Sequence, residues 1–422
     1  MAKHSIDLTP LKKYPDFRNL WAAGLISYLG SMITYVAIPF QIKELTNSYL
    51  AVGIVGAIEL VPLIVFGLYG GVLADSVNRK KMVWATEAGA MLLVALLLAN
   101  SMLWEPKVWV IYIAAGLFAV VDGLQRPSAD AMLPRLVGHQ DLPAATALMS
   151  LRWQLGLIVG PTVGGIIFST FSISAGFAVD MATYVVALVF LARVRSMPSS
   201  KEAKKPSLAA LLDGVKYAFS RQDLIGTYII DLAAMTLAMP MALYPFWADQ
   251  LNAPWALGMF YSAITVGSVL VTVTSGWTTR YRFHGRAVIL AAIGWGLAIA
   301  VAGLSTSLVL VLLFLTIAGA FDMISALFRA NIWNQTIPDH FRGRLAGIEL
   351  LSYSVGPLAG QLRAATIASA TSLSFSVTSG GILCAIVVAF LAFFLPKMWK
   401  YDVETNEFAV RERQNRKNLE NS

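Results

Sequence analysis

The chain has 422 residues and a net charge of +8, with 57% hydrophobic and 13% charged residues, about half the charged share of an average soluble domain. Apolar runs of about 20 residues, the length that crosses a bilayer, recur along the chain, which excludes a soluble protein and predicts a multi-pass protein in the lipid bilayer. The single cysteine, Cys384, excludes an intramolecular disulfide and a cysteine metal cluster, and no metal or cofactor is expected.

Twelve membrane-spanning helices are predicted, so the expected fold class is an all-α membrane protein with two pseudo-symmetric six-helix halves. The predicted spans are 19–42, 50–73, 82–104, 108–127, 145–169, 175–193, 224–247, 255–278, 287–305, 307–329, 345–368 and 373–396. The chain then divides into a cytoplasmic N-terminus (1–18), a first half (19–193), a linker with an amphipathic helix (194–223), a second half (224–396) and a cytoplasmic tail (397–422).

Lysine and arginine are distributed unevenly between the connections. Of the 32 basic residues, 28 lie in the segments that share the N-terminal side of the membrane. Because basic residues gather on the cytoplasmic side of membrane spans, both termini are predicted to be cytoplasmic in a cell membrane. The basic residues thus form a topology pattern, and nucleic acid is not an expected partner.

The first span contains an aromatic stripe. Trp21, Tyr28 and Tyr35 are seven residues apart and share one face of the predicted helix. They are candidates for stacking on an aromatic substrate, and lipid-facing or packing aromatics are the alternative interpretation.

Charged side chains inside the spans are costly in hydrocarbon, so each is a candidate functional group. Asp122 and Arg126 lie four residues apart and can pair on one helix face, and Arg152 can hold the charge of an acid or bind an anionic substrate. A fixed structural ion pair between helices is the alternative interpretation for each. The candidates for proton coupling or substrate binding are Glu59, Asp122, Arg126, Arg152, Asp231, Asp322 and Arg329.

The fifth span contains glycines at every fourth residue, and part of it is repeated. Gly156, Gly160 and Gly164 form a stripe without side chains that lets a neighbouring backbone approach closely, and Pro161 favours a bend. The stretch 159–164 returns as 355–360, and 115–118 returns as 318–321. Two duplicated six-helix halves are the architecture of many secondary transporters, with the substrate site between the halves.

The connection between the second and third spans contains Gly71, Leu73, Asp75, Arg79 and Lys80. Asp75 can cap a helix N-terminus, and Arg79 can pair with a neighbouring acid. These residues match every fixed position of the signature Gly-x-Leu-x-Asp-x-x-x-Arg-Lys, so the chain resembles the major facilitator superfamily. The resemblance implies that Asp75 and Arg79 form a latch that holds the cytoplasmic side closed. A turn that only keeps positive charge inside is the alternative.

Two further resemblances concern the direction of transport. Gly156, Gly160, Pro161, Gly164 and Gly165 resemble the signature of the proton-coupled antiporter branch, although helix packing alone is the alternative reading. The segments 14–18, 39–46, 70–81 and 134–148 resemble the enterobactin-exporter-like group. That resemblance implies export of siderophore-like or hydrophobic small molecules.

The sequence therefore predicts a secondary active transporter, not an enzyme, in the cell membrane of a bacterium. It is expected to work as a monomer by alternating access and to export a siderophore-like or drug-like small molecule in exchange for protons. Two alternatives remain open. One is an importer of the same superfamily that takes up a sugar or organic acid by proton symport, and the other is a membrane receptor or assembly partner that does not transport.

Overall fold

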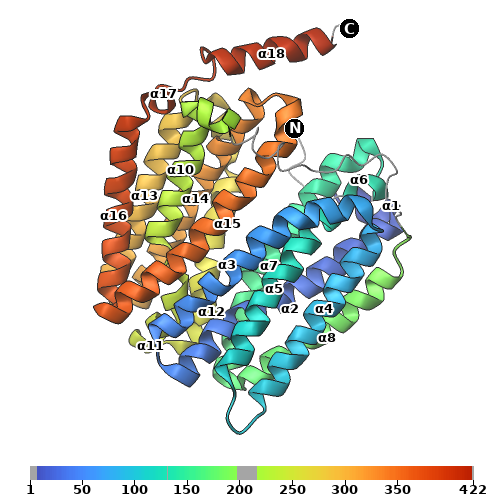
Figure 1. Cartoon of the computed structure of the whole chain (residues 1–422), viewed down its shortest axis with the longest axis vertical. Helices are drawn as coiled ribbons and strands as arrows, with labels where there is room; N and C mark the ends of the chain where they lie inside the picture. Colours follow the sequence, from blue (N-terminus) through green and yellow to red (C-terminus); the bar gives the residue numbers. More distant parts are fainter. Residues whose placement is uncertain (1–6, 131, 197–215, 421–422) are drawn as a thin grey trace. The chain divides into compact units, whose positions relative to one another are not determined.

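The computed structural model describes residues 7–130, 132–196 and 216–420. The side chains of 68–76, 127, 130, 279, 339–344, 346–351 and 415–420 lie outside this description. The described chain is helical and contains no strand (Figure 1), which confirms the all-α prediction. Most of the predicted linker helix also lies outside the described residues. The described part of that segment, residues 216–220, is helical.

The helices follow one another with short connections. The long helices of the first part are α2 (Pro15–Thr46), α3 (Tyr49–Ser76), α4 (Arg79–Ser101), α5 (Val108–Asp130), α7 (Leu142–Thr170) and α8 (Ile173–Ala192). Short elements among them are α1 (Thr9–Lys13), α6 (Leu133–Leu136) and η1 (His139–Asp141). The later part contains α10 (Gln222–Ala238), η2 (Met241–Leu243), α11 (Tyr244–Gln250), η3 (Pro254–Ala256), α12 (Leu257–Val273), η4 (Ser275–Arg280), α13 (His284–Leu304), α14 (Leu308–Thr336), α15 (Asp339–Ala370), α16 (Leu373–Phe394), α17 (Pro396–Trp399) and α18 (Glu407–Glu420).

Eleven segments of the described chain are long and apolar enough to cross a membrane, and the twelfth predicted span, 345–368, lies inside α15. The predicted seventh span, 224–247, is not one continuous helix. α10 ends at Ala238, and Met239 is extended before the chain continues through η2 into α11. Pro240 explains the break, because a proline disfavours helical geometry in the residue before it and has no N–H to donate.

The chain forms two compact units. The first unit contains Met1–Lys205 and Ala248–Ser262, and the second contains Pro206–Trp247 and Ala263–Ser422. The start of α12 therefore belongs to the first unit and its remainder to the second.

The sequence repeat corresponds to a repeat of helix contacts within the units. A Cβ placed on Gly116 of α5 would lie 3.2 Å from Cγ2 of Ile58 in α3, and one on Gly319 of α14 would overlap the carbonyl of Ile264 in α12. In the same way, Gly160 of α7 faces Cβ of Met32 in α2. Gly356 of α15 faces Cβ of Met235 in α10, where an added Cβ would lie 2.7 Å away.

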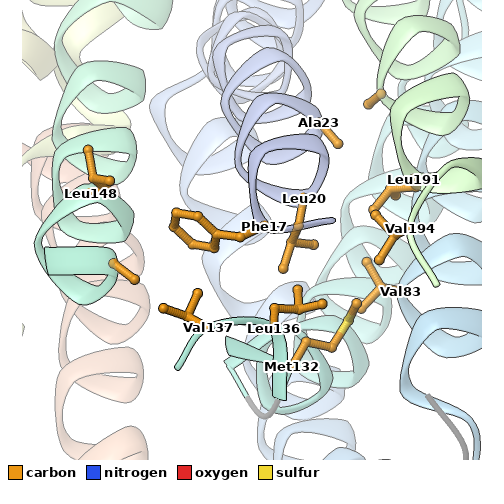
Figure 2. Packing of buried hydrophobic residues seen from close by; sticks show 12 residues of the cluster. Phe17, Leu20, Ala23, Val83, Met132, Leu136, Val137, Leu148, Leu191 and Val194 are labelled. Carbon is orange, nitrogen blue, oxygen red and sulfur yellow. The ribbon is translucent and has the colours of Figure 1, made fainter. Parts of the chain in front are cut away.

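An apolar cluster is buried at the end of the first unit where α2 begins. Figure 2 shows Phe17, Leu20 and Ala23 of α2 among side chains from α4, α6, α7 and α8. Phe17 is fully buried and Met132 also has no exposed surface. Burial of a side chain of this size stabilises a unit by about 1.5–3 kcal/mol, so this cluster stabilises the packing of the helices that contribute to it.

The segment after the last span is docked on the second unit. Tyr401 and Asp402 are buried, and Nε of Arg282, between η4 and α13, donates to Asp402 Oδ2 at 2.9 Å. Hydrogen bonding from Arg282 lowers the pKa of Asp402 below its ordinary value. The guanidinium of Arg221 lies 3.8 Å from the ring centroid of Phe408, and α18 contacts α14 (Figure 1). The tail is therefore part of the packed structure of this unit.

Candidate functional site

The glycine stripe of α7 is a packing surface against α2. A Cβ on Gly156 would overlap the ring of Tyr28, and one on Gly160 would lie 2.8 Å from the carbonyl oxygen of Leu29. A Cβ on Gly164 would lie 3.3 Å from the Cα of Ile33. The two helices thus meet backbone to backbone, as the four-residue glycine spacing predicts.

A second face of α7 packs against the start of α12, which belongs to the same unit. A Cβ on Gly165 would lie 2.7 Å from the backbone nitrogen of Gly258, and one on Gly258 would overlap the carbonyl of Pro161. The hydroxyls of Thr162 and Ser262 are 2.8 Å apart, and Ser262 also donates to the carbonyl of Ile158 at 2.7 Å. The glycine–proline stretch therefore joins α7 to two helices at once.

Arginine and aromatic side chains converge beside the stripe. Tyr28 stacks on Trp153 of α7 with 4.3 Å between the ring centroids, and the guanidinium of Arg126 lies 5.3 Å from the ring centroid of Trp153. Arg152 passes over Gly24 of α2, where an added Cβ would lie 2.7 Å from Cζ. These contacts form a partly exposed aromatic and cationic surface within the first unit.

The other two members of the aromatic stripe have different surroundings. Trp21 donates from Nε1 to the carbonyl of Leu148 at 2.8 Å, so it anchors α2 on α7. Tyr35 is 37% exposed and meets Tyr261 edge to face, with centroids 5.8 Å apart. The structure therefore brings only Tyr28 to the arginine and tryptophan cluster.

The acids of α3 and α5 lie close to this surface. Asp122 pairs with Arg126 at 2.9 Å, and their side chains are 42% and 38% exposed. Glu59 of α3 is partly exposed, and Asp122 is close enough for the two carboxyls to interact electrostatically. Four predicted candidates, Glu59, Asp122, Arg126 and Arg152, thus belong to one neighbourhood of the first unit.

The candidates of the second unit are arranged differently. Arg329 of α14 forms an ion pair with Asp231 of α10, and the two side chains are only 8% and 5% exposed. Ser352 of α15 donates to the other oxygen of Asp231 at 3.0 Å. Asp322, one of the predicted candidates, is partly exposed nearby on α14. The buried pair ties three helices together.

Two buried acids of the first unit were not among the predicted site residues: Asp180 was missed, and Glu87 was noted only as a charge near the cytoplasmic end of its span. Asp180 of α8 has no exposed surface, and Glu87 of α4 is 4% exposed. Thr34 donates to Asp180, and Ser27 donates to Glu87 at 3.1 Å. The signal in the sequence is a single acid in each apolar span opposite hydroxyl residues of α2 at helical spacing.

The loop motif is described only in part. Asp75 was expected to cap a helix, but α3 continues to Ser76, and the residue directly before α4 is Asn78, whose side chain accepts from the Lys81 N–H at 3.2 Å. Lys80 donates to the carbonyl of Ala192 at 2.9 Å. The side chains of Gly71, Leu73 and Asp75 lie outside the described residues, so the latch stays a prediction.

The described residues contain no group of three or more His, Cys, Asp or Glu side chains that is placed to hold a metal ion. What they do contain is a set of acids, arginines and hydroxyls between helices. Such groups serve proton transfer and anion binding inside membranes.

Comparison with known proteins gives matches over nearly the whole chain. A family profile described as transmembrane secretion effector matches residues 5–420. The enterobactin exporter EntS of Escherichia coli (strain K12) is 28% identical over 401 residues, which cover 92% of this chain and 95% of the relative.

Solved structures share the fold. The crystal structure of the nucleoside transporter NupG aligns with a TM-score of 0.72 at 12% identity and covers 92% of this chain and 100% of that one. A bacterial homologue of the human lysosomal transporter Spinster aligns with a TM-score of 0.73 at 12% identity, covering 92% and 98%. At these identities the likeness concerns the helical fold alone.

Proposed function

Because the chain belongs to the transmembrane secretion effector family of the major facilitator superfamily, we propose that it exports a siderophore-like or hydrophobic drug-like small molecule by alternating access, driven by proton antiport. The observation that carries the proposal is the similarity to an enterobactin exporter along 92% of the chain. Membership of this family makes the protein a multi-pass transporter rather than an enzyme.

The proposed topology places the protein in the inner membrane of a bacterium with both termini in the cytoplasm. The strong bias of basic residues toward one side of the membrane supports this orientation. Residues 19–193 and 224–396 act as the two halves of a monomer, joined by the cytoplasmic segment 194–223. The proposed motion is a rocking of one half against the other around the substrate.

The chemistry of the first unit supports an aromatic, acidic substrate. Trp153 offers a ring that already stacks on Tyr28 and carries the guanidinium of Arg126. Arg152 supplies a second cation in the same neighbourhood. Aromatic stacking with an arginine beside it favours a planar anion over a neutral sugar, which supports a siderophore-like molecule or another organic acid as the substrate over a sugar.

The proposed coupling groups are Glu59 and Asp122. Asp122 shares a salt bridge with Arg126, and a carboxyl that alternates between a paired and an unpaired state alternates between releasing and holding a proton. Glu59 approaches Asp122 from the neighbouring helix α3, so the charge of one acid acts on the other.

The test is transport of enterobactin into inside-out proteoliposomes under an imposed pH gradient. We expect accumulation with the wild-type protein and loss of its dependence on the gradient in Glu59→Gln or Asp122→Asn. Glu105→Gln is the matched control, because the Glu105 side chain is 75% exposed in a connection between helices. Unchanged coupling in both coupling variants would contradict their assignment, and transport in the opposite direction would favour the importer.

The proposed latch has its own test. Asp75→Asn should slow turnover while the amount of protein in the membrane stays normal, because the amide cannot pair with a cation of the closed cytoplasmic side. Normal turnover in this variant would remove the latch role from Asp75.

A further inference from the structure

The interior of the first unit contains a line of hydroxyls that the proposed substrate surface does not use. Ser27, Ser31 and Thr34 are spaced four and three residues apart, so they share one face of α2, which packs against α8. Ser31 lies 2.8 Å from the hydroxyl of Tyr184 in α8. We name Ser27, Ser31 and Thr34, together with Tyr184 of α8, the α2 hydroxyl seam. At a rise of 1.5 Å per residue, Ser27 and Thr34 are about 10 Å apart along the helix.

One end of the seam is the carboxyl of Asp180, which receives a hydrogen bond from Thr34. Thr183 Oγ1 lies 2.7 Å from the backbone carbonyl of Asp180 and 3.2 Å from its Oδ1. A hydroxyl has a single hydrogen, and the shorter contact to the carbonyl uses it. Oδ1 is then left with only the longer contact from Thr183, so a strong donor reaches just one of the two carboxyl oxygens.

The other end is the carboxyl of Glu87. Ser27 and Gln125 both donate to Oε1, at 3.1 and 2.8 Å, while the buried Oε2 has no hydrogen-bond partner among the described residues. An ionised carboxylate gains most when donors reach both of its oxygens. Two donors on Oε1 and none on the buried Oε2 leave the charge of an ionised Glu87 incompletely solvated, which favours the neutral acid.

The surroundings do not supply a salt bridge for either acid within the described part of the chain. The charge of Arg152 in α7 reaches Glu87. The two acids also act on each other, and both interact electrostatically with Tyr184 of α8. Burying an unpaired carboxylate is far more costly than burying the neutral acid. Both acids therefore belong in the protonated state when the first unit is packed as described.

The fold does not require these hydroxyls. Met32 and Met235 occupy equivalent places under the repeated glycines, and this register aligns α2 with α10. The positions of α10 that correspond to Ser27, Ser31 and Thr34 are then Ile230, Ala234 and Leu237. The second half packs the same helix with apolar residues, so the seam is a feature of the first half alone.

We propose that Glu87 and Asp180 form a proton-binding site inside the first unit, in which the two buried carboxyls hold and release protons while hydroxyls of the α2 hydroxyl seam donate to each of them. The two acids are buried, in contrast to the partly exposed Glu59 and Asp122, and the charge of Asp122 reaches Tyr184 of the seam. As a coupling site it rests on the proposed proton antiport, whereas the binding of protons by the two acids does not.

Infrared spectroscopy tests the binding of protons directly on the purified protein. Exposed carboxyls are ionised at pH 7, so a protonated carboxylic acid C=O band at that pH reports buried acids. We expect this band in the wild-type protein and the loss of a separate component in Glu87→Gln and in Asp180→Asn, with no change in Glu105→Gln. Spectra of the two variants that superimpose on the wild type would overturn the proposal.

Transport tests the coupling role. Gln and Asn keep the shape of a protonated acid but cannot release a proton, so Glu87→Gln and Asp180→Asn should still exchange labelled enterobactin across the bilayer at equal pH. A pH gradient should no longer raise the internal concentration above the external one in these variants. Normal gradient-driven accumulation in both variants would overturn the coupling role alone. A wild-type protein that exchanges enterobactin but ignores the gradient would remove the antiport itself.

Discussion

The buried ion pair between Asp231 and Arg329 allows the most direct test of how the second unit is held together. The side chains are 5% and 8% exposed, and Ser352 donates to the same carboxylate from a third helix. Asp231→Asn leaves the shape nearly unchanged but leaves the guanidinium of Arg329 buried without its counter-charge. Breaking a buried pair in this way costs about 3–5 kcal/mol, because the remaining charge is desolvated and uncompensated.

The expected shift in melting temperature follows from the size of the unit. For domains of about 150–250 residues, 1 kcal/mol changes the midpoint by about 2–4 °C, so Asp231→Asn should lower it by about 6–20 °C. Arg329→Met in the same chain removes the stranded charge and should recover most of this loss, since replacing a whole buried pair by apolar groups is often close to neutral.

The chain carries its own reporter for this measurement. Cys384, the single cysteine, lies in α16 of the second unit and has no exposed surface. A thiol-reactive fluorogenic dye therefore reacts during a thermal ramp in detergent only when this unit opens.

Asp322→Asn, on α14, is the matched control, because it removes the same charge from a partly exposed carboxyl that reaches Arg329 electrostatically but forms no salt bridge among the described residues. We expect its midpoint to stay close to that of the wild type. Equal midpoints for Asp231→Asn and Asp322→Asn would refute the reasoning, and so would a double variant less stable than Asp231→Asn.

Two further predictions concern the first unit and the tail. Gly156→Ala should lower the midpoint of thermal unfolding, followed by circular dichroism, by an amount equivalent to about 1–3 kcal/mol, because its methyl group would overlap a tyrosine ring of α2; Gly89→Ala, whose methyl group has room, should not. Asp402 has a lowered pKa, so the stability it contributes is present above its unfolded value of about 3.9 and is lost as pH falls through its folded value. A spin label at Gln414 should therefore become more mobile only at pH below about 4 in the wild type and at every pH in Asp402→Asn, while a pH-independent spectrum in the wild type would contradict the anchoring by Arg282.

Sequence reasoning reached the architecture because its signals are local or periodic. Apolar length located the spans, and the recurrence of Gly116 at Gly319 identified the duplication that the helix contacts show. The pairing of Asp122 with Arg126 was also within reach, since four residues on a helix bring two side chains together without knowledge of any other helix.

Partners on different helices were beyond the sequence. Asp231 and Arg329 are almost a hundred residues apart, and the spacing of residues on one helix says nothing about which neighbour it faces. Asp180 was missed for the same reason, because its hydrogen-bond donor, Thr34, lies on another helix. The cap of α4 is Asn78 rather than Asp75, because the capping position depends on where the preceding helix ends, which here is Ser76.

The register of the repeat shows how the two halves have diverged at one shared place. Arg329 is the counterpart of Arg126, and with Met32 aligned to Met235 the residue that corresponds to Asp231 is Tyr28. In the second half this place holds a buried ion pair between two helices, while in the first the arginine pairs with Asp122 on its own helix and lies over the ring of Trp153, on which Tyr28 stacks. The side chains of the second-half pair are only 5% and 8% exposed, whereas those of Asp122 and Arg126 are 42% and 38% exposed, and an exposed pair is much weaker. The first half therefore holds its arginine less tightly and also keeps the buried acids, so binding and proton transfer are expected to be concentrated there, with the second half as the more rigid partner.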